Sequence, residues 1–103
     1  MASERRLTVI YAPRALRDLR GIADYLGERS PSGTKRVFAA IKSSIDDLEM
    51  FPGLGAAVDE KGHRRLPIVS VPYAIYYRLA GGEVIVLHIR HTSRKPVDPA
   101  SDL

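Results

Sequence analysis

The 103-residue sequence contains no cysteine. The chain can therefore form neither a disulfide framework nor a metal site built on thiolates. It also has no apolar run near the roughly 18 residues that a membrane helix needs, and its first residues carry no apolar segment of signal-peptide length. From these absences we expect a soluble protein that acts in the cytoplasm without contacting a membrane.

Acidic side chains are scarce in the second half of the chain. Residues 61–95 contain seven lysines and arginines but a single acidic residue, Glu83, whereas residues 1–60 contain nine basic and nine acidic residues. A basic surface of this kind attracts an anionic partner, which could be a nucleic acid, a protein bound to nucleic acid or an acidic peptide. A basic surface that is only solvated explains the same bias equally well.

The length predicts one compact domain, and the 45% share of hydrophobic residues argues against disorder over most of the chain. We assign this domain to residues 1–95. Residues 96–103 contain Pro96 and Pro99 and show no apolar periodicity, so we predict a flexible C-terminal tail there.

The first half of the chain predicts a strand followed by two helices. Residues 6–11 are rich in β-forming side chains and predict the strand, and Pro13 then suits the first turn of a helix. Apolar residues recur at helical spacing over residues 16–26, although Gly21 costs about 1 kcal/mol there relative to alanine.

A second helix is predicted to start at Ser30 and Pro31, which suit the N-cap and the first helical position. Its apolar face runs from Val37 to Leu48. Because only a short turn separates the two helices, we expect them to lie nearly antiparallel.

The apolar period changes from 3.6 to 2 after a glycine-containing loop at residues 50–62. Residues 64–69, 73–79 and 83–91 are predicted as strands, and Gly81-Gly82 marks a hairpin turn between the last two. The predicted fold is therefore α+β in the order β-α-α-β-β-β. An antiparallel helical hairpin packs on one face of a small, mainly antiparallel four-stranded sheet.

The helical hairpin can cover only one face of such a sheet, which leaves the other face open for a partner. Alternation along residues 73–79 places one set of side chains in the core: Tyr73, Ile75, Tyr77 and Leu79. It places the other set on the open face: Ala74, Tyr76 and Arg78.

Several local patterns resemble the RelE/ParE superfamily of bacterial toxins, and ParE-like members in particular. They are residues 15–25 of the first helix, Ser30-Pro31, residues 48–55, Arg65, residues 72–77 and residues 89–94. The resemblance implies the growth-inhibiting toxin of a type II toxin–antitoxin system, which poisons DNA gyrase without a cofactor. It also implies a ParD-like antitoxin with a ribbon-helix-helix part, which forms a hetero-oligomer such as a 2:2 complex and supplies the contact with DNA.

RelE-like members of the superfamily instead cleave mRNA on the ribosome, with cations and a late tyrosine on the sheet face. The positions that match these residues are Arg65, Pro67, Ala74, Thr92 and Asp98, so only the first keeps a cation. Cleavage without a metal needs a base, a proton donor and cations over the phosphate. We therefore predict a toxin with no catalytic residue. A RelE-type ribosome-dependent mRNA endonuclease, built on a substitute set that includes histidine, remains the alternative.

The resemblance and the open face together give candidate contacts with the antitoxin or the target: Tyr25, Arg65, Tyr76, Arg78, His88, His91 and Arg94. His88 and His91 are three residues apart on a strand and should point to opposite faces, so we predict no metal site. For either histidine, a structural role through hydrogen bonds is more common than a catalytic one.

Overall fold

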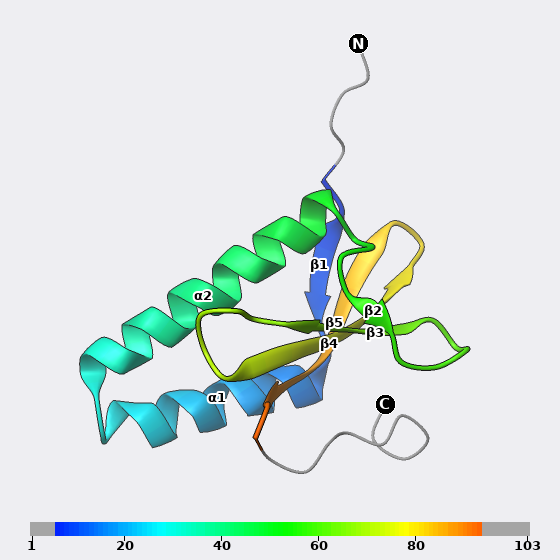
Figure 1. Ribbon diagram of the computed structural model, residues 1–103. Helices are drawn as coiled ribbons and strands as arrows, with labels where there is room; N and C mark the ends of the chain where they lie inside the picture. The colour runs from blue at the N-terminus through cyan, green and yellow to red at the C-terminus, as the bar shows by residue number, and fades with distance from the viewer. Residues whose placement is uncertain (1–5, 94–103) are drawn as a thin grey trace.

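The computed structural model describes residues 6–93, which fold into two helices and five strands. The elements follow one another as β1 (Thr8–Tyr11), α1 (Pro13–Gly27), α2 (Pro31–Met50), β2 (Ala56–Ala57), β3 (His63–Pro67), β4 (Tyr73–Ala80) and β5 (Glu83–His91). Figure 1 shows the two helices as a hairpin beside the sheet. The α+β class is confirmed. The tail predicted at residues 96–103 lies outside the described residues.

The sheet has the strand order β1-β5-β4-β3-β2, in which β1 and β5 are parallel and the other neighbours are antiparallel. The prediction of four strands was short by one, because β2 pairs Ala56 and Ala57 with Arg65 and Arg64. Two alanines show no alternation of apolar and polar side chains, so they carry no strand signal in the sequence.

Each helix begins at a proline, as predicted, but the two N-termini are held differently. No side chain caps α1, whereas the Ser30 Oγ accepts the Gly33 N–H at 3.0 Å and caps α2. A Cβ on Gly33 would lie 2.9 Å from that Oγ. Glycine at this position therefore leaves room for the cap.

The core lies between the helical hairpin and one face of the sheet. The helices contribute Ala15, Ile22, Val37, Ile41, Ile45 and Leu48, and β4 and β5 contribute Tyr73, Ile75, Tyr77, Val84, Val86 and Ile89. The placement of Leu79 in the core was wrong, because this residue is 41% exposed. It lies two residues before the turn at Gly81, where β4 ends.

A β-bulge in β5 decides which of its side chains face the core. The register shifts between Tyr76 and Tyr77 of β4, which leaves Leu87 of β5 without a cross-strand partner. Val86 and Ile89 both lie in the core although they are three residues apart, a spacing that places side chains of a regular strand on opposite faces. The extra residue shifts the alternation by one position, so Ile89 faces the core where a regular strand would have turned it away.

Candidate functional site

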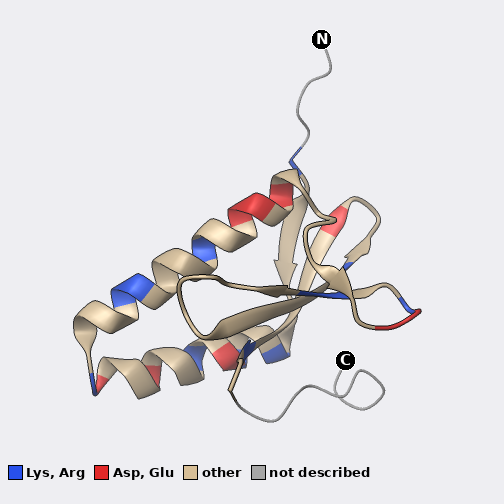
Figure 2. Cartoon of the chain, viewed as in Figure 1, with Lys and Arg blue, Asp and Glu red and all other residues tan. Residues whose placement is uncertain are grey.

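Three arginines lie on the sheet face opposite the helical hairpin, one on each of three neighbouring strands. They are Arg65 on β3, Arg78 on β4 and Arg90 on β5, and we call this set the basic face. Among residues 6–93, none of the three forms an ion pair with a carboxylate. Figure 2 shows the acidic residues of the helices gathered instead at the C-terminal end of α2 and along α1. The basic face is therefore available for an anionic partner.

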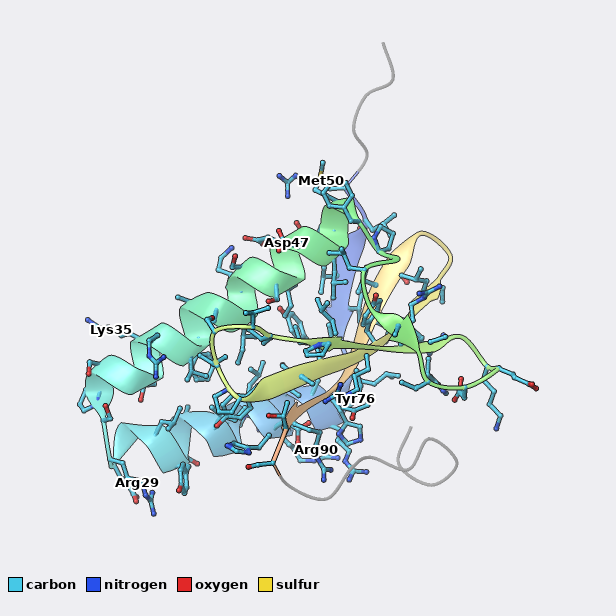
Figure 3. The ribbon with its side chains drawn as sticks, viewed as in Figure 1. Arg29, Lys35, Asp47, Met50, Tyr76 and Arg90 are labelled. Atoms are coloured by element: carbon cyan, nitrogen blue, oxygen red, sulfur yellow. The ribbon has the colours of Figure 1, made fainter. Side chains whose placement is uncertain are left out.

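Tyr76 lies on this face, as predicted, but it is only 6% exposed. Its hydroxyl accepts the Arg65 Nε–H at 3.1 Å, and the edge of its ring meets His88 at a centroid distance of 6.4 Å. Figure 3 labels Tyr76 together with Arg90, which projects from the neighbouring strand. Tyr76 thus orients the Arg65 guanidinium, and its own surface for contact with a partner is small.

His88 is 1% exposed, so the structure places this candidate contact inside the molecule. Its Nδ1 lies 3.2 Å from the Asp18 Oδ2 of α1, and the same oxygen accepts the Ile89 N–H at 3.0 Å. Asp18 therefore ties α1 to β5 through two hydrogen bonds. Asp18 was not among the predicted contacts, although its position three residues after Ala15 and four before Ile22 puts a carboxylate on the buried face of the helix.

A groove of about 380 Å³ opens between α1 and the end of β5. It is lined by Arg17, Gly21 and Tyr25 of α1 and by Tyr73, Arg90 and His91 of the sheet. Two predicted contacts, Tyr25 and His91, therefore line one groove. Tyr25 is 48% exposed, and the Arg29 guanidinium stacks over its ring at 3.9 Å. The last candidate, Arg94, lies outside the described residues.

His91 has a defined tautomer in this groove. Its Nδ1 accepts the Ser93 N–H at 3.2 Å and lies 2.7 Å from the Ser93 hydroxyl. A backbone N–H can only donate, so Nδ1 carries no hydrogen and the neutral ring must carry its hydrogen on Nε2. His91 therefore offers a donor, and its ring is held edge-on against Tyr73 at a centroid distance of 5.2 Å.

His63 lies at the other end of the basic face, across from Arg78. Its Nδ1 is 2.5 Å from the Asp59 Oδ2, and this hydrogen bond is the main reason why the pKa of Asp59 is lowered. The strand predicted from the sequence begins at residue 64, one residue after His63, whereas β3 includes it. A histidine held by a carboxylate can act as an acid or a base, so His63 is the histidine of the basic face best placed for chemistry.

Among residues 6–93 there is no group of histidine and acidic side chains that could hold a metal ion. No helix in the same part of the chain is long and apolar enough to cross a membrane. What the fold offers is a compact scaffold with an unpaired basic face and an adjoining groove. These features suit the binding of an anionic partner.

Comparison with known protein families narrows the class of protein to one family. The family model described as "ParE toxin of type II toxin-antitoxin system, parDE" matches residues 9–96. This match spans most of the chain, so the chain belongs to the ParE toxin family of type II toxin–antitoxin systems, as its sequence patterns predicted.

Individual relatives agree with the family. Toxin RelE2 of Caulobacter vibrioides is 36% identical over 86 residues, which cover 84% of this chain and 96% of that protein. Y4kP of Sinorhizobium fredii is 31% identical over 90 residues, with 87% and 93% covered. A chain from the chromosomal ParDE toxin–antitoxin system of P. aeruginosa matches with a TM-score of 0.73 over 85% of this chain and 98% of that chain. Its sequence identity is 22%, so this likeness shows the shared fold.

Proposed function

We propose that this chain inhibits bacterial growth by binding DNA gyrase in the cytoplasm and that a ParD-like ribbon-helix-helix antitoxin neutralises it. Membership of the ParE toxin family supports the proposal. One observation of the structure favours protein binding over RNA cleavage. Pro67 and Ala74 face each other on neighbouring strands, at positions where the resemblance implies cations in RelE-like nucleases.

The chemistry of cleavage explains why these two residues matter. A nuclease without a metal needs cations over the scissile phosphate and an acid and a base beside it. Pro67 and Ala74 supply neither, the Arg65 Nε is engaged by Tyr76, and His88 is buried. The basic face remains suited to hold the acidic side chains of a protein partner.

The contacts with the antitoxin belong to the same proposal. The basic face (Arg65, Arg78 and Arg90) would set the register of the bound antitoxin segment and its association rate. Charges that stay near solvent contribute mainly to these two properties. Apolar contacts beside Tyr25 would supply most of the affinity. The antitoxin segment that fits such a surface is acidic and amphipathic.

A second candidate function is a RelE-type mRNA endonuclease. His63 favours it, because this histidine is held by Asp59 and lies across from Arg78 on the basic face. The name of the relative Toxin RelE2 agrees with this candidate. His63 would then serve as the base, and Arg78 would stabilise the phosphate.

One experiment separates the two candidates. The chain is expressed in a bacterium with and without the antitoxin from the adjacent gene, and growth, the DNA-damage response and mRNA integrity are followed. We expect growth arrest that the antitoxin relieves, a DNA-damage response and intact transcripts in primer extension. Cleavage in the ribosomal A site that disappears in His63→Ala would establish the endonuclease instead. Normal growth with soluble toxin would refute both.

A further inference from the structure

The groove between α1 and β5 exists because β1 is shorter than β5. β1 pairs only with residues 83–86, and β5 continues to His91, so the last part of its edge has no neighbouring strand. α1 lies beside this edge and is joined to it through Asp18 and the Ile89 N–H. Further along the helix the two elements separate, and the groove opens between them.

The walls of the groove carry more positive than negative charge. Arg17 projects from α1 and Arg90 from β5, and neither forms an ion pair with any carboxylate of residues 6–93. Asp18 also lines the groove, but its Oδ2 is engaged by Ile89 and His88. Two unpaired guanidinium groups beside a concave surface favour an anion.

His91 adds a hydrogen-bond donor to these charges. Because the Ser93 N–H occupies its Nδ1, the ring presents an N–H at Nε2. The rings of Tyr25 and Tyr73 form apolar walls beside it. This combination of donors and aromatic surface suits a carboxylate carried on a short apolar stem, as in aspartate or glutamate.

Gly21 keeps the groove open. Apart from its chain neighbours and the backbone of its own helical turn, no atom lies within 4 Å of the position that a Cβ on this residue would take. A glycine lowers the stability of a helix at such a position. The absence of a side chain at Gly21 leaves room for a partner to approach the helix closely.

We infer that this groove receives an acidic side chain of the antitoxin, with Arg17 and Arg90 as its counter-charges. The inference rests on the proposed toxin function and makes it more specific. The positive charge of the groove favours an acidic occupant. The groove is also continuous with the basic face, because Arg90 belongs to both. An antitoxin segment that lies on the basic face can cross the edge of β5 and place one carboxylate in the groove.

Two pairs of matched variants test the groove without disturbing the core. Gly21→Leu fills the groove, whereas Gly27→Leu adds the same side chain to an equally open position of α1 outside the groove. Arg17→Ala removes a charge from the groove, and Arg20→Ala removes an exposed charge of the same helix outside it. Leucine and alanine favour helix formation, so loss of binding would not come from unfolding of α1.

The affinity of each purified variant for the antitoxin is measured by calorimetry at low and high salt. We expect Gly21→Leu and Arg17→Ala each to weaken binding on the order of tenfold or more, and the two controls to change it less than about twofold. In a double-mutant cycle, one acidic residue of the antitoxin should show coupling to Arg17 that is absent with Arg20.

The possible failures are distinct. If the unmodified chain is toxic and binds the antitoxin but Gly21→Leu binds as tightly as Gly27→Leu, the groove is empty in the complex and this inference is wrong. If Gly21→Leu weakens binding but no antitoxin carboxylate couples to Arg17, the occupant is not an acidic side chain. If the unmodified chain neither arrests growth nor binds the antitoxin, the proposed function fails together with the inference.

Discussion

Replacing Asp18 with alanine should destabilise the protein more than most single substitutions do. The carboxylate accepts the Ile89 N–H at 3.0 Å and lies 3.2 Å from the His88 Nδ1, and both of these partners are buried. Hydrogen bonds to charged groups contribute about 1.5–3 kcal/mol each, and a buried donor left without a partner adds to the loss. The higher helix propensity of alanine offsets less than about 0.7 kcal/mol. We therefore expect a loss of about 3–5 kcal/mol in the free energy of unfolding.

Urea denaturation followed by circular dichroism measures this loss, with Asp24→Ala as the control. Asp24 is an exposed aspartate on the same helix and has no hydrogen bond or ion pair among the interactions of residues 6–93, so its replacement should change stability by less than about 0.5 kcal/mol. Asp18→Asn keeps one acceptor oxygen and should fall between the two. A difference below about 1 kcal/mol between Asp18→Ala and Asp24→Ala would refute the role of Asp18 as the tie between α1 and β5.

Three further predictions concern other parts of the fold. Tyr77→Phe should cost about 1–3 kcal/mol in urea denaturation, because its hydroxyl accepts the Gly55 N–H at 2.8 Å inside the molecule; an unchanged midpoint would contradict this. The pKa of Asp59 is lowered chiefly by its hydrogen bond with His63. The stability that the Asp59 carboxylate contributes is therefore present above the usual pKa of an aspartate and is lost as the pH falls through the lowered pKa of Asp59. Stability measured against pH should therefore fall less steeply below about pH 4 for Asp59→Asn than for the unmodified chain, and identical curves would rule this out. Gly33→Ala should fail to stabilise α2 despite the propensity of alanine, because its Cβ would crowd the Ser30 cap, and a higher thermal midpoint would show that the cap yields.

Sequence patterns predicted most of the fold because long periodic segments specify their own structure. The apolar faces of α1 and α2 and the hairpin at Gly81-Gly82 all follow from local rules of spacing and turn chemistry. β2 escaped prediction because its two exposed alanines show no alternation of apolar and polar side chains. Leu79 was misplaced because alternation shows which face a side chain occupies but does not show how far the helices extend over that face.

The candidate site was harder to predict, because burial on the open face depends on packing between elements. Alternation correctly placed Tyr76 opposite the helices, but it could not show that Arg65 and His88 pack around the ring. The groove depends on the position of α1 relative to β5, which the spacing within one segment does not contain. Asp18 and Gly21 did leave signals, as a carboxylate on a buried helix face and as a glycine in a helix interior.

The groove beside β5 can be traced to a few residues near the start of the chain. Pro13 opens α1 only two residues after Tyr11, the last residue of β1, so β1 pairs with just the first half of β5. An exposed strand edge invites unwanted pairing with other chains, and Asp18 blocks such pairing at Ile89 by taking its N–H. One helical turn later Gly21 leaves the space beside the same edge empty. The helix therefore engages one backbone donor of this edge and leaves space beside it for one side chain, as the proposed binding of an antitoxin carboxylate requires.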